Sequence, residues 1–203
     1  MSDINIKFPK DKIVFGLDFK NINNDKIYLM NSPLVLDNCL SFDGDSWIYT
    51  SINKSVNYLF CDSNNEWTCD VWFKPNGING LISGVGNTTF GIYVENSNLK
   101  CKLRGTESII ETNLCSLDSH AVTVTWDGNK ALGYYNGLNP IKLNVGNDEV
   151  ENNNDGLCDS LEGDLRLYNR FSGDIFANYL YKSALSQDEV YDRYIITIRE
   201  INI

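Results

Sequence analysis

The sequence predicts an all-β protein made of antiparallel strands. Short runs alternate apolar and polar residues, as in 99–104, where Leu99, Cys101 and Leu103 share one face and cations occupy the other. Turn signals of the Asp-Gly and Asn-Gly type separate these runs at intervals of about 8–12 residues. This spacing favours an antiparallel sandwich or barrel over βαβ units.

A chain of 203 residues suits one domain, whose core is large enough to need neither a disulfide nor a metal. Apolar runs bounded by turn residues place the strands along most of the chain. The expected strands are 13–19, 47–51, 67–74, 80–85, 90–94, 99–104, 109–112, 121–126, 130–135, 141–145, 164–168 and 174–181.

One short helix is expected near the end of the chain. Ser186 and Glu189 have the spacing of a capping box, with Ser186 as the N-cap. Val190 and Tyr194 follow on one face, and the helix is predicted to end near Tyr194. Residues 195–203 are rich in β-branched side chains and are predicted to form a strand-like tail. Residues 146–160 are predicted to form a long polar loop.

The six cysteines are expected to be free thiols. No Cys-x-x-Cys pair and no Cys/His cluster occurs, which excludes a zinc site of the usual spacing. Cys69 shares the apolar phase of its strand with Trp67, Val71 and Phe73. A thiol in such a position behaves as a small buried hydrophobe.

The acidic charge excludes one class of partner. Asp and Glu outnumber Lys and Arg by 27 to 17, which gives a formal net charge of −10. Nucleic-acid binding depends on neutralising phosphates with cations, so no nucleic-acid partner is expected. The N-terminus has no apolar run of the signal-peptide kind, and no stretch is long and apolar enough to span a membrane. We expect neither export nor membrane insertion.

Five segments follow one another in a recognisable order. They are LSFDGD at 40–45, WTCDVWFKP at 67–75, HAVTVTWDG at 120–128, YYNG at 134–137, and GDI at 173–175 followed by YKSALSQDEV at 181–190. Together they resemble the motifs of LamG-like jelly rolls in the concanavalin A-like lectin/glucanase superfold.

This resemblance implies a jelly-roll sandwich of two antiparallel sheets over 13–194, with one short C-terminal helix. Residues 1–12 would then form an N-terminal lead and 195–203 a tail. In this family the concave face or its rim loops often bind glycans or proteins, sometimes with a structural calcium. The superfold also includes glucanases, so the fold alone does not decide the function.

Catalysis is not expected. Glycoside hydrolysis needs two carboxyl groups flanking the scissile bond, and the family's hydrolases carry them as Glu-x-Asp-x-(x)-Glu on one strand. No such run occurs, and the nearest pair, Glu149 and Glu151, falls in the polar loop. His120 is the single histidine, which excludes a two-histidine metal site. The resemblance places it as a structural residue at the start of a strand.

Aromatic side chains are the candidate ligand-binding residues, because glycans stack on aromatic rings. Trp47 and Tyr49 share one face of a predicted strand, opposite Ile48. Tyr134 and Tyr135 are the other two candidates.

Acidic turns are the candidate metal site. Asp43 and Asp45, or Asn154, Asp155 and Asp159, supply oxygens of the kind calcium prefers. Ordinary acidic turns are the alternative, and no other cofactor is expected.

The leading hypothesis is a non-enzymatic interaction module on a phage particle, as a capsid decoration, head fibre or tail fibre protein. Virion proteins are made in the host cytoplasm and leave by lysis, so they need neither an export signal nor disulfides. The 27 asparagines and single glutamine fit an AT-rich phage genome. A cellular lectin is the alternative, and a glycoside hydrolase ranks last.

The tail is expected to dock on a neighbouring virion protein by adding a strand to its sheet. The residues expected to make this contact are Ile195, Ile196, Ile198, Ile201 and Ile203.

Overall fold

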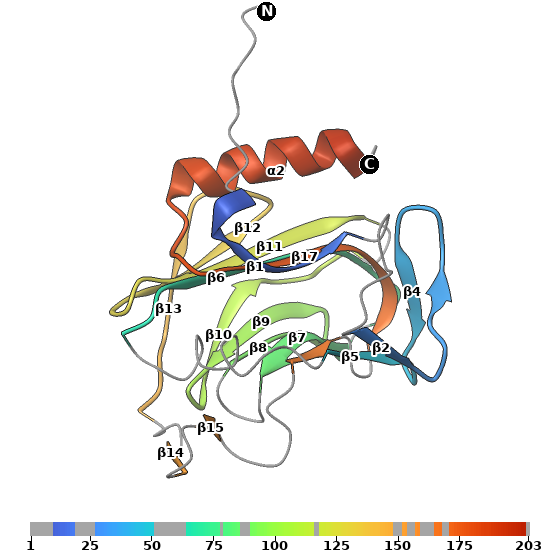
Figure 1. Ribbon diagram of the computed structural model, residues 1–203, viewed down its shortest axis with the longest axis horizontal. Coiled ribbons are helices and arrows are strands. Elements are labelled where there is room, and N and C mark those ends of the chain that lie inside the picture. The colour runs from blue at the N-terminus through green and yellow to red at the C-terminus, as the bar shows by residue number, and fades with distance from the viewer. Residues whose placement is uncertain are drawn as a thin grey trace, which may run out of the picture.

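The structure is a computed structural model of the chain, and it describes residues 10–18, 27–50, 64–77, 79–85, 90–115, 118–147, 152–153, 157–158, 165–167 and 171–201. Three layers lie on one another: the C-terminal helix α2 (Gln187–Ile201), a first sheet (sheet A) and a second sheet (sheet B) (Figure 1). All strand pairs in both sheets are antiparallel. The predicted antiparallel two-sheet sandwich with one C-terminal helix is therefore confirmed.

Sheet A is the middle layer of the molecule. Its path runs through β13 (Ile141–Leu143), β12 (Ala131–Tyr135), β11 (His120–Trp126), β6 (Trp67–Pro75), β17 (Ser172–Tyr181), β4 (Leu40–Asp43) and β3 (Leu34–Val35), and β1 (Ile13–Asp18) also pairs with β17. Every residue of β11 is buried, and so is every residue of β6 except Lys74. A strand covered on both faces needs a layer on each side, and here α2 and sheet B are those layers.

Sheet B has one face on the core and one face turned away from it. Its path runs through β10 (Thr106–Glu111), β9 (Asn98–Leu103), β8 (Phe90–Glu95), β7 (Asn79–Val85), β16 (Leu165–Leu167), β5 (Trp47–Thr50) and β2 (Ile27–Met30). In β9 the residues alternate between half-buried and buried. The buried set is Leu99, Cys101 and Leu103, as the period-two pattern predicts.

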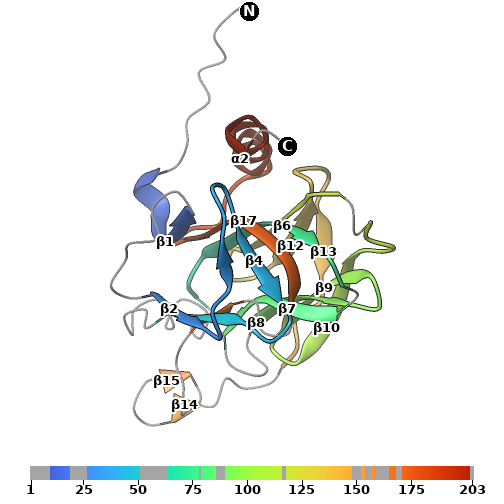
Figure 2. The same ribbon diagram turned by 90° about the vertical axis from the view of Figure 1, so that its right-hand side faces the viewer.

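A short ladder lies apart from both sheets. Its strands are β14 (Asn152–Asn153) and β15 (Leu157–Cys158). Both views place them on the side of sheet B that faces away from α2 (Figures 1 and 2). The segment predicted as a polar loop therefore contains a two-stranded pairing, and its remaining residues from 148 onward lie outside the described part of the chain.

The main core lies between the two sheets. Trp67, Val71 and Phe73 of β6 belong to it, together with Phe90 of β8. The rings of Trp67 and Phe90 meet edge to face with centroids 4.9 Å apart, an arrangement that aromatic pairs favour. Cys69 lies in the same cluster, which confirms its predicted place in the apolar phase of the strand.

The four cysteines with described side chains are free: Cys39, Cys69 and Cys101 are buried and Cys115 is exposed. Cys61 and the side chain of Cys158 lie outside the described part. Burial raises the pKa of Cys69 to about 12 and that of Cys39 to about 11. Because the thiolate is the reactive form, we expect the buried thiols to stay protonated and to react slowly at neutral pH.

The strand-like tail predicted at 195–203 is wrong, because α2 continues through these positions to Ile201. The predicted helix end near Tyr194 is wrong for the same reason. The strand preference of isoleucine is weak and yields to tertiary packing. That packing is visible at Ile198, which lies against Trp72, Ala121 and Ala177 of sheet A. The structure also contains strands β2, β3 and β4 and a 3₁₀ turn, η1 (Lys10–Lys12), where no element was predicted.

Candidate binding face

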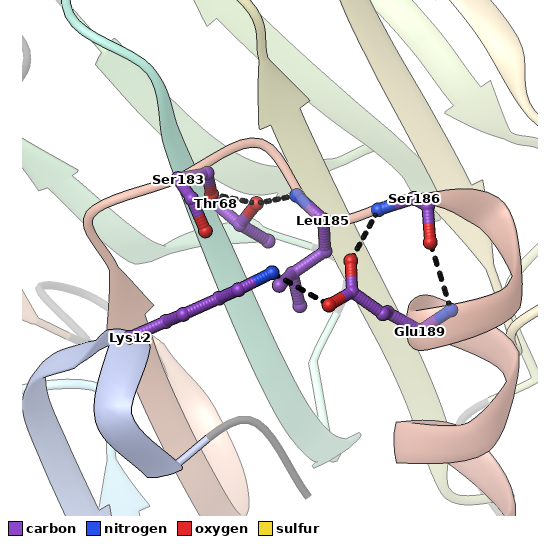
Figure 3. A network of polar contacts seen from close by, with 6 residues as sticks. All are labelled: Lys12, Thr68, Ser183, Leu185, Ser186 and Glu189. Atoms are coloured by element: carbon purple, nitrogen blue, oxygen red, sulfur yellow. Dashed lines mark hydrogen bonds and ion pairs between the residues drawn. The ribbon is translucent and has the colours of Figure 1, made fainter. Parts of the chain in front are cut away.

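The N-terminus of α2 is capped as the sequence predicts. The Ser186 amide donates to Glu189 Oε2 at 2.9 Å, and the Glu189 amide donates to Ser186 Oγ at 3.3 Å (Figure 3). Lys12 Nζ, from η1, lies 2.6 Å from Glu189 Oε1. Burial by itself raises the pKa of Glu189, but the hydrogen bonds from Lys12 and from the Ser186 amide lower it below its ordinary value.

Thr68 ties the segment before α2 to the middle of sheet A. Its hydroxyl donates to the Ser183 carbonyl at 2.8 Å and accepts from the Leu185 amide at 2.9 Å (Figure 3). Leu185 is buried in a cluster with Tyr134, Tyr181 and Val190. The start of the helix is therefore held both by polar contacts and by an apolar cluster under its first turn.

A buried ion pair joins the middle of α2 to β6. Arg193 Nε lies 3.2 Å from Asp70 Oδ2, and both side chains are 2% exposed. Thr123 Oγ1 of β11 donates to Asp70 Oδ1 at 2.9 Å. The Arg193 guanidinium lies over the Tyr179 ring at 4.3 Å. Burial raises the pKa of Asp70, while Arg193 and Thr123 act in the opposite direction. This pair was not predicted from the sequence.

The C-terminal half of α2 covers sheet A with aromatic and aliphatic contacts. The Tyr194 ring stacks on the Trp72 ring with centroids 5.2 Å apart and an interplanar angle of 21°. A Cβ added at Gly137, in the turn after β12, would lie only 2.6 Å from the Tyr194 Cβ, so turn and helix are in close contact. The central strands of sheet A, β6, β11, β12 and β17, are therefore covered on their outer face by the chain's own helix.

This closure overturns Tyr134 as a ligand-binding residue. Tyr134 is 2% exposed and packs under α2 with Tyr181 and Val190. Tyr135 points to the other face of β12, where it packs against the core between the sheets. The two tyrosines do not form one platform, because neighbouring residues of a strand face opposite sides.

Tyr135 has a structural partner in His120, at the start of β11 as predicted. His120 Nε2 donates to the Cys115 carbonyl at 2.8 Å, which leaves Nδ1 as the acceptor for the Tyr135 hydroxyl at 2.7 Å. His120 is 3% exposed. Its hydrogen bonds fasten the turn before β11 to β12, which is a structural role.

The outer face of sheet B carries a cluster of charges and one aromatic ring. Lys100 of β9 contacts the Glu95 carboxylate, and its Nζ lies 3.6 Å from Glu107 Oε2 and 6.0 Å from the centre of the Tyr93 ring. The contact with Tyr93 holds the pKa of Glu107 below its usual range, and the contact with Glu95 raises the pKa of Lys100. These residues were not predicted from the sequence as part of a site.

One cross-strand row connects this cluster to the predicted aromatic site. Phe90 and Ile92 point into the core, so Gly91 between them lies on the outer face of sheet B. The row of paired positions through Gly91 runs Tyr28, Tyr49, Arg166, Gly84, Gly91, Lys102 and Glu107.

Leu81 is the side chain that lies over the glycine part of the row. A Cβ added at Gly84 or Gly91 would lie 3.2 Å or 3.6 Å from Leu81 Cδ1. Lys102, Glu107 and Ile109 lie beyond the glycines and are half-buried or exposed. We call the row, with its Tyr93, Lys100 and Leu81 neighbours, the sheet B face.

Trp47 and Tyr49 thus lie on β5, within sheet B and away from the helix-covered sheet A. Their side chains lie outside the described part of the structure. The prediction that they share the face opposite Ile48 stays a prediction. The register places Tyr49 in the same row as Gly84 and Gly91, which sequence reasoning did not foresee because it involves three distant segments.

The acidic turn at 43–46 has a structural explanation. Asp43 Oδ1 accepts from the Asp45 amide, the Ser46 amide and Ser46 Oγ, each at 2.9 Å. The hydrogen bond from the Asp45 amide, with those from Ser46, lowers the pKa of Asp43. Among the described residues, no three His, Cys, Asp or Glu side chains gather in a way that could hold a metal ion. Calcium binding stays a prediction, to be tested by melting with and without the ion.

The isoleucines predicted to dock on a partner lie on α2 rather than on a strand. Ile195, Ile196 and Ile198 are half-buried, and Ile198 packs on sheet A. The side chain of Ile201 and all of Ile203 lie outside the described part. The prediction that the tail adds a strand to a partner's sheet is therefore wrong, because the backbone hydrogen bonds of residues 195–201 are used within the helix.

The fold is shared with solved structures of binding domains and of an enzyme. The botulinum neurotoxin serotype D binding domain matches with a TM-score of 0.68 and 14% identity, over 93% of this chain and 52% of that one. The binding domain of botulinum neurotoxin DC in complex with rat synaptotagmin II matches with a TM-score of 0.67 and 11% identity, over 92% and 52%. Trypanosoma rangeli sialidase matches with a TM-score of 0.66 and 13% identity, over 94% and 33%.

These likenesses concern the fold. The chain spans about half the length of the neurotoxin binding domains and about a third of the sialidase. No family model and no curated protein sequence matches the chain. In the part of the chain that the structure describes, no helix has the length and apolar character needed to cross a membrane.

Proposed function

We propose that the chain is a non-enzymatic binding module of the LamG-like kind, which attaches to carbohydrate through the sheet B face. The observation that carries the proposal is that α2 covers the central strands of sheet A, from Thr68 and Glu189 at one end to Trp72 at the other. The other outer face of the sandwich belongs to sheet B, where the side chains of Lys102, Glu107 and Ile109 are half-buried or exposed.

The chemistry of the sheet B face supports a sugar ligand. Carbohydrate sites combine aromatic surface with a few polar groups that fix orientation. Here Tyr49 shares a row with Lys102 and Glu107, and Tyr93 and Lys100 lie beside that row. The neurotoxin structures of the same fold are binding domains, one of them described in complex with SialylT.

A glycan array probed with the full chain tests this proposal. We expect saturable binding that is lost in Trp47→Ala, because a ring on β5 supplies the stacking surface. Tyr191→Ala is the matched control, since Tyr191 is an aromatic residue 48% exposed on α2. Binding that survives Trp47→Ala but is lost in Tyr191→Ala would contradict the proposal, as would the absence of saturable binding.

The setting we propose is a phage particle, with the module as a decoration or fibre protein bound to other virion proteins. The free thiols at Cys39, Cys69, Cys101 and Cys115 support assembly in a reducing compartment. The asparagine-rich composition supports an AT-rich genome. Mass spectrometry of purified particles from cells that express the chain should detect it in many copies. Its absence from particles would favour the alternative, a cellular lectin.

A hydrolase ranks last among the three functions. The sialidase that shares the fold is matched over only 33% of its length, so the match does not assign its activity to this chain. The buried carboxylate of Asp70 is engaged by Arg193 and Thr123 beneath α2. We expect a glycan found on the array to be recovered intact after incubation with the chain. Release of a sugar would contradict this part of the proposal.

A further inference from the structure

One edge of sheet A, at β3, carries three consecutive exposed apolar side chains. Leu34, Val35 and Leu36 are 62%, 52% and 41% exposed. They lie on and directly after β3, which pairs with β4 on one side, and no described strand pairs with its other side. An apolar strand edge of this kind is a template for pairing with another chain.

The backbone of β3 is turned so that Val35 can make new hydrogen bonds. The Leu36 amide donates to the Cys39 carbonyl at 3.0 Å, and Leu34 is paired with Ser41. In an antiparallel ladder, alternate residues direct their N–H and C=O groups to the same neighbour. Leu34 and Leu36 therefore face β4, and the N–H and C=O of Val35 face outward.

The edge is also held in place before any partner arrives. Asn31 and Ser32 adopt left-handed backbone, with φ of 54° and 53°, in the tight turn that leads from β2 to β3. The Asn31 side-chain amide donates to the Asp45 carbonyl at 2.9 Å, which fastens this turn to the turn before β5. A fixed strand loses little conformational freedom on pairing.

We propose that this edge pairs with the same edge of a second copy of the chain, in antiparallel orientation about a two-fold axis at Val35. The sequence Leu34-Val35-Leu36 reads the same in both directions. A two-fold axis at Val35 sets Leu34 against Leu36 of the partner subunit, so that every side-chain pair is apolar. The two Val35 residues exchange two N–H···O hydrogen bonds, and sheet A continues across the interface.

Charge opposes a second copy least at this edge. The chain has a net charge of −10, so two copies repel each other over most of their surfaces. Residues 31–36 carry no ionisable side chain, which makes this edge a place where two acidic copies meet without opposed charges. A standard interface buries about 800 Å² per partner, and three side chains supply only part of that. We therefore expect a weak dimer that strengthens as salt screens the repulsion.

Sedimentation equilibrium of the full chain over a range of concentrations tests the proposal. Val35→Lys and Val35→Glu should each weaken the dimer by at least about tenfold, because two like charges then face each other at the axis. An equal mixture of these two variants should dimerise again, since lysine then faces glutamate. Val14→Lys is the matched control, as Val14 is an apolar residue 36% exposed on β1 of the same sheet, and it should dimerise like the unaltered chain.

Each other outcome overturns the proposal. A chain that stays monomeric at millimolar concentration and high salt has no such interface. A dimer that persists in Val35→Lys uses another surface. A mixture of Val35→Lys and Val35→Glu that stays monomeric shows that the two Val35 positions do not face each other. None of these outcomes bears on sugar binding at the sheet B face, which a monomer presents as well.

Discussion

Arg193 on α2 and Asp70 on β6 form an ion pair that is buried between the helix and the sheet, with Nε and Oδ2 3.2 Å apart. The pair lies between the capped start of the helix and the stacked rings of Trp72 and Tyr194. Its position makes the helix a layer of the sandwich rather than an appendage. Because that layer covers one outer face, the pair also bears on which face is free to bind.

Removing one charge of this pair should destabilise the folded chain. In Arg193→Met, Asp70 stays buried without its counter-charge, and we expect the free energy of unfolding to fall by about 3–5 kcal/mol. The double variant Arg193→Met with Asp70→Asn removes both charges and keeps an acceptor for Thr123. Denaturant unfolding should show that the double variant recovers at least half of the loss. A double variant no more stable than Arg193→Met would show that the charge is not the cause.

The capping box should contribute stability that depends on pH. The folded-state pKa of Glu189 is lowered, so its contribution is present above the unfolded value of about 4.3 and is lost as the pH falls through the folded value. Glu189→Gln should therefore melt below the unaltered chain at pH 7, and the two should converge near pH 3. Ser186→Ala should cost about 1 kcal/mol at pH 7. A difference in melting temperature between Glu189→Gln and the unaltered chain that stays constant with pH would contradict this role.

The contact between the turn after β12 and α2 should make Gly137 sensitive to substitution. Gly137 has φ of +66°, and an added Cβ would meet Tyr194 at 2.6 Å. Gly44→Ala is the matched control, because Gly44 has φ of +97° with nothing within 4 Å of an added Cβ. The control should lose about 1–2 kcal/mol from backbone strain alone. Gly137→Ala should lower the free energy of unfolding clearly more than the control does. Equal losses of unfolding free energy in calorimetry would contradict a tight contact with the helix.

Thiol reactivity should follow burial. Cys115 should react with a thiol reagent in the folded chain, while Cys39, Cys69 and Cys101 should stay protected because they are buried and their pKa values are raised. All four should react after denaturation, as read by mass spectrometry of labelled peptides. Protection of Cys69 or Cys101 that survives denaturation would show a disulfide.

The parts of the fold that could be predicted are those where a local residue pattern is compatible with only one structure. Cys69 and Cys101 fell in the apolar phase of strands that do face the core, and the Ser186 and Glu189 spacing did start the helix. The β-branched residues at 195–198 led to the wrong prediction of a strand. Their local preference favours a strand, but contacts with Trp72 and Ala121 stabilise a helix. Those contacts join residues more than 70 positions apart, and no local pattern records them.

The candidate site could be placed from the sequence only in part. Trp47 and Tyr49 were proposed as ligand-binding residues from alternation within one strand, which stays a prediction, and the register of sheet B places their strand away from the helix-covered sheet. Tyr134 was proposed for the same reason, as an aromatic side chain, but it lies under α2. Asp70 occurs between Cys69 and Val71, in the phase of the strand that points away from the core between the sheets, and only the packing of α2 reveals that it is buried with Arg193. In β6 the residues that alternate with the core residues include an aromatic one, Trp72. An aromatic residue on that second face could have indicated that another layer covers the strand.

We place the ligand face on sheet B and not on the helix-covered side of sheet A. The most direct test is a calorimetric titration of the full chain with a glycan chosen from the array, compared between Tyr49→Ala and Tyr191→Ala. We expect Tyr49→Ala to raise Kd at least about tenfold, which corresponds to the loss of roughly 1.4 kcal/mol of stacking, and Tyr191→Ala to leave Kd within about twofold. A tenfold loss in Tyr191→Ala with an unchanged Kd in Tyr49→Ala would contradict this placement.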